Sequence, residues 1–324
     1  MTRNSDTKDS EQSDTARNDA PRSSLAFGRI VGIVFIVYFA ASMLALLVVQ
    51  GPAWGAGNVA VIDMRGPIFA EGASATLFSA GYPGARDYVA RIEAAAADER
   101  FDAIVLRINS GGGSPVGSRE IVEAVSEVEK PVVVFIREIG ASGAYWVAAA
   151  SDHIIADPLA ITGSVGVRAS YLEFSELFEE YGITYVNLDG GAYKSTGSPF
   201  TNLSEEERAL LMERVDYMHA FFLDSVVGFR GLSERDAQDL ELIGSGIYFI
   251  GEEAVSLGLI DELGSWSRVE DVLGDFGVEK VEYAYLRIDR SPLADLAGFA
   301  RSFGYAIGTG IGSMLERDPY PSLG

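Results

Sequence analysis

The chain has no cysteine and very few lysines and histidines. The absence of cysteine excludes disulfides, thiolate zinc sites, iron–sulfur clusters and a cysteine nucleophile among the 324 residues. Only six residues could act as a lysine or histidine base, and they are Lys8, Lys130, Lys194, Lys280, His153 and His219. Any mechanism that needs one of these residue types therefore has a short set of candidates.

Basic residues as a class are scarce, because 25 Lys and Arg stand against 47 Asp and Glu and leave a net charge of −22. Phosphate binding needs basic patches, so we expect no nucleic-acid partner. Residues 1–29 are neutral overall, and the whole excess belongs to residues 30–324. A lysine-poor, acidic surface suits high salt, where charges are screened within about 3 Å at 1 M. Equal stability in low and molar salt would contradict that hypothesis.

The N-terminal part of the chain predicts a tail and a membrane anchor. Residues 1–24 are polar and are expected to be disordered. Residues 30–49 carry no charge, and twenty helical residues match the roughly 30 Å hydrocarbon core of a bilayer. Arg22 and Arg29 precede this run, so the positive-inside rule predicts a cytoplasmic N-terminus and an extracytoplasmic remainder. We assign the transmembrane signal anchor to residues 25–50.

Two alternatives for the apolar segments stay open. A cleaved signal peptide would have a shorter apolar region of about 7–15 residues, but the small residues Ala53, Gly55 and Ala56 are compatible with cleavage. The C-terminal segment, residues 291–324, is apolar and glycine-rich but is interrupted by charge. We expect it to contact a partner subunit or the membrane surface, and a second span is the alternative.

Between these segments, short β-branched runs alternate with helical periodicity. This pattern is typical of an α/β fold with a parallel sheet and βα repeats, and we assign one domain to residues 57–290. The predicted strands are 59–63, 103–108, 131–136, 153–156, 183–188 and 280–287. The predicted helices are 84–98, 116–129, 143–151, 171–181, 204–229, 252–257 and 266–273. Ser204 and Glu207 have the spacing of a capping box at the start of the longest helix.

Two glycine-containing turns follow predicted strands, where α/β folds place their ligand sites. Residues 109–115 read NSGGGSP, and backbone N–H groups of such a run can point at an anion. A tight structural turn is the alternative. Residues 140–145 read GASGAY, and a serine in a sharp strand-to-helix turn can be exposed as a nucleophile. Ser142 is therefore a candidate nucleophile, although serine at a helix start is often only a cap.

A serine nucleophile needs a base, and Lys194 is the strongest candidate. It lies in a loop rich in glycine and hydroxyl groups, whereas His153 and His219 lie in apolar segments. Burial can lower a lysine pKa by the roughly three units that base catalysis near neutral pH requires. Ser164 is a plausible third hydroxyl that would hold the amine. The residues thus suggest a Ser–Lys dyad, with an exposed loop lysine as the alternative.

Together these residues resemble the signal peptide peptidase A (SppA) family of membrane-bound serine proteases, relatives of the Clp protease subunit and of crotonase-like folds. The resemblance covers residues 59–266. Its motifs are the glycine loop at 109–113, Ala-Ser-Gly at 141–143, Thr-Gly-Ser-x-Gly-Val at 162–167, Tyr-Lys-Ser-x-Gly-Ser-Pro-Phe at 193–200 and Gly-Glu-Glu-Ala-x-x-x-Gly-Leu-Ile-Asp at 251–261. It implies a Clp protease/crotonase-like fold.

The resemblance implies a role for each matching residue. Ser142 would be the nucleophile, Lys194 the general base, Gly113 an oxyanion donor and Ser164 a hydrogen-bond partner of the lysine. Gly143 is a second donor on the geometry of the turn. The family's proline before the glycines is glycine here, which leaves the register of the oxyanion donor open by one residue.

Two further departures concern the size of the site. Ala144 stands where a second glycine is common, and Trp146 adds bulk beside the nucleophile. We expect these changes to affect the pocket more than the mechanism.

The resemblance implies a membrane-anchored endopeptidase that cleaves residual signal peptides or other hydrophobic peptides through an acyl-enzyme, with no cofactor or metal. The chain carries one protease unit, like half-length members that assemble into homo-oligomeric rings. The alternatives are a crotonase-like acyl-CoA hydratase or hydrolase and an inactive membrane scaffold with the same fold. Loss of peptide cleavage in Ser142→Ala and Lys194→Ala would separate the protease from both.

Overall fold

The computed structural model describes residues 33, 35–39, 41–42, 56–73 and 81–286. The chain divides into two units, Met1–Gly51 and Pro52–Gly324. In the first unit, the described residues are helical. The predicted tail, most of the predicted anchor and the C-terminal segment lie outside the described residues. In the ranges that the structure describes, no helix is both long enough and apolar enough to cross a membrane.

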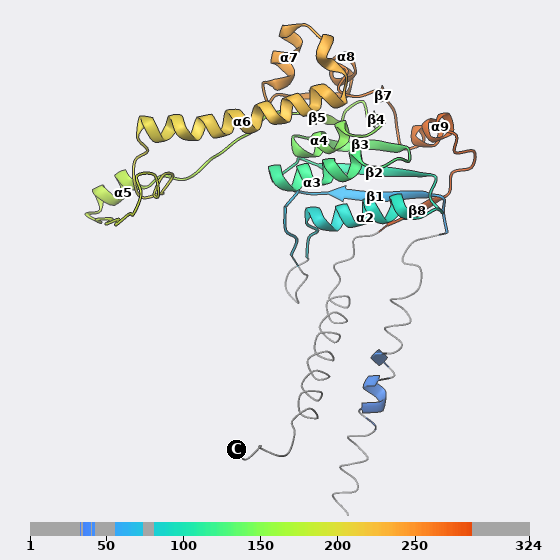
Figure 1. The fold of residues 1–324 in the computed structure, drawn as a ribbon, viewed down its shortest axis with the longest axis horizontal. Coiled ribbons are helices and arrows are strands. Elements are labelled where there is room, and N and C mark those ends of the chain that lie inside the picture. The colour runs from blue at the N-terminus through green and yellow to red at the C-terminus, as the bar shows by residue number, and fades with distance from the viewer. Residues whose placement is uncertain (1–32, 34, 40, 43–55, 74–80, 287–324) are drawn as a thin grey trace, which may run out of the picture. The chain divides into compact units, whose positions relative to one another are not determined.

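The second unit is built on an eight-stranded sheet (Figure 1). Its strands are β1 (Val59–Arg65), β2 (Ala103–Ser110), β3 (Val132–Ala141), β4 (His153–Ala156), β5 (Ile161–Gly163), β6 (Tyr248–Ile250), β7 (Glu262–Leu263) and β8 (Tyr283–Tyr285). The order is β6-β5-β3-β2-β1-β8, with β4 paired to β3 and β7 paired to β4. All pairs are parallel except β5 with β6. The predicted mixed α/β class with a largely parallel sheet is confirmed.

Helices cover both faces of this sheet. They are α2 (Ala85–Ala97), α3 (Pro115–Ser126), α4 (Gly143–Ala149), α5 (Ser175–Glu180), α6 (Glu205–Phe229), α7 (Ala237–Gly244), α8 (Gly251–Ser256) and α9 (Arg268–Asp275), with a 3-10 turn at Leu232–Glu234. Successive side chains of a strand point to opposite faces. Ile62 and Met64 of β1 accordingly join the core beneath α2, α3 and α4, whereas Val59 and Val61 pack with α9. Burial on both faces explains why these strands are almost wholly apolar.

The longest helix begins where the sequence predicts it. The Ser204 hydroxyl accepts a hydrogen bond from the N–H of Glu207 at 3.2 Å, and the Glu207 carboxylate accepts one from the N–H of Ser204 at 3.0 Å. This reciprocal pair is the predicted capping box, and it satisfies two donors that the helix itself cannot pair.

The predicted strand at residues 183–188 is wrong. This segment is irregular and exposed, with Leu188 at 93% and Val186 at 72% of their full accessibility. Its β-branched residues have no sheet edge beside them, and β-propensity without a pairing partner does not make a strand. The predicted helix at 171–181 shortens to α5. The two- and three-residue strands β5, β6 and β7 and the helix α7 were not predicted, because such short elements carry no readable period.

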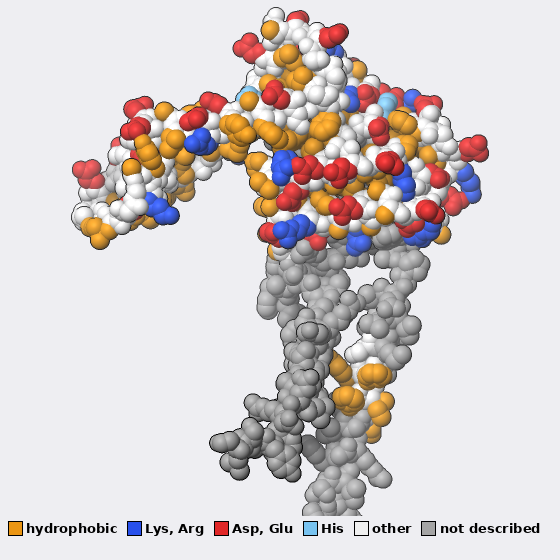
Figure 2. Space-filling model, in the orientation of Figure 1, with side chains coloured by type: hydrophobic (Ala, Val, Ile, Leu, Met, Phe, Trp, Pro, Cys, Tyr) orange, Lys and Arg blue, Asp and Glu red, His pale blue; other side chains and the backbone are white. Residues whose placement is uncertain are grey.

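One part of the second unit differs from the rest. None of residues 169–211, which we call the arm, is buried. Figure 1 shows α6 running out beyond the sheet, with α5 and the loop between α5 and α6 at its far end. Figure 2 shows apolar side chains exposed along the arm and beneath α6. A stack of Phe178 and Tyr185 against Phe200 is the arm's own small aromatic cluster.

Candidate active site

Ser142 lies in a sharp turn between β3 and α4. Its backbone has φ 53° and ψ −129°, a left-handed conformation that costs a non-glycine residue about 1–3 kcal/mol. The turn is held because the N–H of Ser142 donates to the carbonyl of Gly163 at 2.7 Å. The serine side chain makes no capping bond to α4 and lines a cavity instead. A strained serine at a strand-to-helix turn has the geometry of a nucleophile elbow.

The glycine loop after β2 presents an unpaired donor to this turn. The N–H of Ile68 donates to Gly112 and the N–H of Ser114 donates to Ile68, so the intervening N–H of Gly113 faces the other way. A Cβ on Gly143 would lie 3.4 Å from the nitrogen of Gly113. Among the described residues, neither Gly113 nor Gly143 has a backbone acceptor for its N–H. Two free donors therefore lie beside the candidate nucleophile.

Gly112 is a functional position that the sequence reasoning did not single out. Its φ is +88°, and a Cβ there would lie 2.5 Å from the nitrogen of Gly143 and 3.0 Å from the Cβ of Ser142. Only glycine lets the loop and the turn approach so closely. The run of three glycines is the signal that could have identified it.

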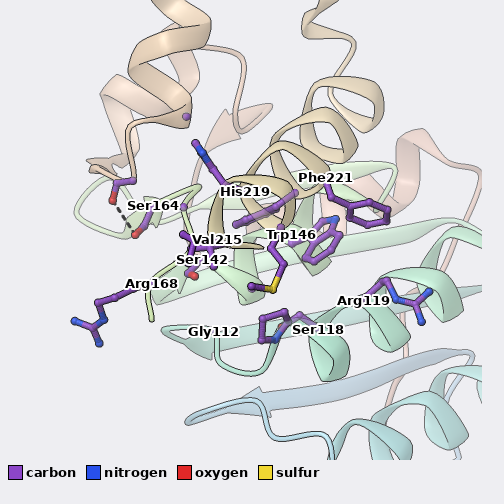
Figure 3. A pocket seen from close by; sticks show the side chains of 18 of the residues that line it. Gly112, Ser118, Arg119, Ser142, Trp146, Ser164, Arg168, Val215, His219 and Phe221 are labelled. Carbon is purple, nitrogen blue, oxygen red and sulfur yellow. Dashed lines mark hydrogen bonds between the residues drawn. The ribbon is translucent and has the colours of Figure 1, made fainter. Parts of the chain in front are cut away.

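A cavity of about 1100 Å³ surrounds these groups. The glycine loop and the start of α3 line one side, and Ser142 and the α4 residue Trp146 line it beside them. Across from them, α6 contributes residues from Met212 to Phe222. Figure 3 shows Ser142 between Gly112 and the α6 residues Val215 and His219. The cavity is large enough for several residues of an extended peptide.

Ser164 lines the same cavity from the segment after β5. It also has a positive φ, 51°, and its N–H donates to Ile247 at 2.9 Å. Its hydroxyl donates to the carbonyl of Gly246 at 3.1 Å (Figure 3). The two lone pairs of that hydroxyl can still accept hydrogen bonds. The structure thus brings Ser142, Gly113, Gly143 and Ser164 together around one cavity.

Lys194 lies elsewhere. It is an exposed residue of the arm and does not line the cavity. The preceding Tyr193 donates its hydroxyl to Glu206 at 2.5 Å, which places this loop beside the first turn of α6. Val215 of α6, which lies beside Ser142 in Figure 3, comes nine positions after Glu206, a rise of about 14 Å along the helix. Lys194, in the loop held at Glu206, therefore lies outside the Ser142 cavity of its own chain.

The other lysine and histidine candidates for the base have other contacts. His153 pairs with Glu262 at 3.1 Å, and Lys130 donates to the carbonyls of Ala95 and Asp98 at the end of α2. His219 does line the cavity. Its Nε2 is buried without a hydrogen-bond partner in the described part of the chain.

Nε2 of His219 lies 3.6 Å from where a Cβ of Gly244 would stand, at the end of α7. In Figure 3 this ring points away from Ser142. Within the described ranges, no three His, Asp or Glu side chains are grouped to hold a metal ion.

Known proteins with similar sequences fall mainly among peptidases. Residues 124–276 match Peptidase family S49. A candidate protease of Methanocaldococcus jannaschii is 29% identical over 296 residues, which cover 88% of this chain and 93% of that protein. A candidate signal peptide peptidase SppA of Enterococcus faecium is 29% identical over 230 residues, covering 70% of this chain and 65% of that protein.

The third comparison is partial. The Na(+)/H(+) antiporter NhaA of Brucella melitensis biotype 1 is 37% identical over 213 residues. These residues make up 64% of this chain but only 28% of the antiporter. The chain therefore spans less than two thirds of both bacterial relatives described here, and the antiporter match concerns about a quarter of that protein.

Proposed function

Because the chain belongs to peptidase family S49 and is a serine peptidase of the signal peptide peptidase A type, we propose that it cleaves hydrophobic, membrane-associated peptides, residual signal peptides among them. The observation that carries this proposal is the strained turn at Ser142 beside two unpaired N–H groups. A nucleophile and oxyanion donors in one cavity are what acyl transfer requires. No observation favours acyl-CoA chemistry.

In the proposed reaction, the Oγ of Ser142 attacks the peptide carbonyl while Lys194 takes its proton. The N–H groups of Gly113 and Gly143 stabilise the oxyanion of the tetrahedral intermediate. Lys194 then passes the proton to the leaving amine, and the C–N bond breaks to leave an acyl-enzyme on Ser142. A water molecule, deprotonated by the same lysine, hydrolyses the ester and restores the serine.

A second copy of the chain supplies the lysine in this proposal. Lys194 does not line the cavity that holds Ser142, and the arm that carries Lys194 has no buried residue. An arm that covers the cavity of the next copy is a heterologous contact, and such contacts form a ring when the rotation from copy to copy closes. Docking would bury the lysine amine beside Ser142, out of contact with bulk water. The free lone pairs of Ser164 would accept hydrogen bonds from its amine.

The proposed location follows from the sequence pattern. The uncharged run at residues 30–49 would anchor the chain in the membrane, with a cytoplasmic tail and an extracytoplasmic catalytic domain. The C-terminal segment, residues 291–324, would contact the membrane surface or a neighbouring copy. The apolar wall that α6 gives to the cavity, with Met212, Val215 and Phe222, suits substrates left in or near a bilayer.

The test is hydrolysis of a fluorogenic signal-peptide substrate by the full chain in detergent. Ser142→Ala and Lys194→Ala should each lose at least about 10³-fold in kcat. A mixture of the two variants should recover about a quarter of wild-type activity, since a random ring places an intact serine beside an intact lysine at one site in four. His153→Ala, at a histidine that does not line the cavity, is the control and should stay active.

Each result is decisive for one part of the proposal. Full activity in either single variant would exclude the dyad. Inactive single variants without recovery on mixing would place both residues in one copy. Thioester hydration without peptide cleavage would overturn the peptidase assignment of this site.

A further inference from the structure

Trp146 occupies a position from which it can limit the depth of the cavity beside Ser142. The N–H of Trp146 donates to the carbonyl of Ser142 at 3.0 Å, so Trp146 follows the nucleophile by one turn. Both residues line the same cavity. Figure 3 shows the ring lying between Ser142 and Phe221.

The indole is fixed in place. Its N–H donates to the hydroxyl of Ser225 at 2.7 Å, which anchors it to α6. The ring packs against Phe222 with centroids 4.9 Å apart and meets Phe221 edge-on at 5.9 Å. Only 5% of Trp146 is accessible. A side chain held by one hydrogen bond and two ring contacts cannot swing aside to admit a larger group.

We propose that Trp146 sets the size limit for the substrate side chain just before the scissile bond, so that aliphatic residues are accepted and aromatic residues are rejected. This inference rests on the proposed function, because it concerns the peptide that Ser142 attacks. A carbonyl placed between Ser142 and the donors of Gly113 and Gly143 brings its own residue next to the nucleophile. The indole that lines the cavity there is apolar and fixed, so it favours apolar side chains and resists bulky ones.

The expected size of the preference for leucine over phenylalanine can be estimated from the selectivity of hydrophobic pockets in other enzymes. One methylene group too many or too few changes kcat/KM by about 10- to 200-fold. An aromatic ring exceeds a leucine side chain by more than one methylene. The wild type should therefore prefer leucine over phenylalanine at this position by at least about 10-fold.

The experiment compares peptides that differ only in that residue, which is alanine, leucine or phenylalanine. Trp146→Ala should raise the phenylalanine-to-leucine ratio of kcat/KM by at least about 10-fold, because the cavity deepens. Ser225→Ala frees the indole without removing it and should raise the ratio by a smaller factor. Leu159→Ala, at an exposed position between β4 and β5 that does not line the cavity, is the matched control and should leave the ratio unchanged.

An active Trp146→Ala enzyme with the wild-type ratio would overturn the inference. If that variant does not fold, Trp146→Phe takes its place. A phenylalanine-to-leucine ratio of kcat/KM equal to that of the wild type would then contradict the inference. A wild type that cleaves the phenylalanine peptide as well as the leucine peptide would also contradict it. Failure of the proposed function looks different, because the wild type would then cleave none of the peptides or Ser142→Ala would cleave them.

Discussion

The arm and the body of the catalytic unit, by which we mean its other described residues (56–73, 81–168 and 212–286), differ in how far their apolar side chains are buried. In the body, the central strands have side chains with no accessible surface, such as Ile104 and Leu106 of β2. In the arm, residues 169–211 include no buried side chain, and Leu172 and Tyr181 are each 71% accessible. Large contiguous apolar patches are unusual on the surface of a monomer and often mark interaction surfaces. The body folds around its own core, whereas the arm buries none of its residues and, in the proposed assembly, packs against a neighbouring copy.

This difference separates the parts of the proposed chemistry. The nucleophile and the two N–H donors are held by the body, where the strain at Ser142 is supported by buried strands on both sides. The proposed base is held by the arm, whose own apolar packing is the small cluster around Phe200. We infer that stability depends mainly on the body and that activity depends on where the arm docks.

The largest expected effect is on the arm surface. Val186→Asp combined with Leu188→Asp adds two charges at exposed positions, so the melting temperature should change little. If a neighbouring copy buries these residues, unpaired charges there are costly, and peptide hydrolysis should fall at least about 100-fold with loss of the oligomer. Analytical ultracentrifugation and the hydrolysis assay measure both.

Leu159→Asp is the matched control for this pair of substitutions. Leu159 is 82% accessible and belongs to the body, between β4 and β5. It should keep both assembly and activity. Wild-type activity in the double aspartate variant would show that the arm does not dock through this surface.

The sequence predicted the secondary structure of the body more completely than that of the arm. Buried parallel strands read as continuous β-branched runs, which is why the strands that became β1 to β4 could be located. Ser142 and Gly113 could be expected together because the strands that precede them are neighbours in the sheet. The positive φ of Ser142 could not be predicted from the sequence. It depends on the hydrogen bond to Gly163, a residue distant in sequence.

The arm shows why the position of Lys194 and the structure of residues 183–188 could not be predicted from the sequence. The order of motifs along the chain placed Lys194 after Ser164, but order carries no distance, and α6 is 25 residues long. The same β-branched composition that marks strands in the body predicted a strand at residues 183–188, where no edge pairs with it. One signal was available: α6 carries apolar residues such as Tyr217 on more than one side, as expected for a helix with further partners.

A smaller effect is expected at Tyr145, in the body. Its hydroxyl donates to the carbonyl of Leu259 at 2.7 Å, and complete burial raises the pKa of Tyr145, so the phenol stays protonated at neutral pH. Tyr145→Phe leaves that buried carbonyl unpaired and should lower the free energy of unfolding by about 1–3 kcal/mol. Urea denaturation measures it. Tyr217→Phe, 71% accessible on α6, is the control, and an equal loss there would contradict the role of burial.

The smallest expected effect is at Ser204, where α6 begins in the arm. Ser204→Ala removes the hydroxyl that accepts from the N–H of Glu207, and loss of such a cap costs about 1 kcal/mol. Because residues 169–211 bury nothing in the core, this cost should appear as local fraying and not in global unfolding. Hydrogen exchange should become faster for amides 206–208 while β2 and β3 keep their protection. If the urea midpoint instead falls as it does for Tyr145→Phe, the arm and the body unfold as one unit, and the division drawn between them is wrong.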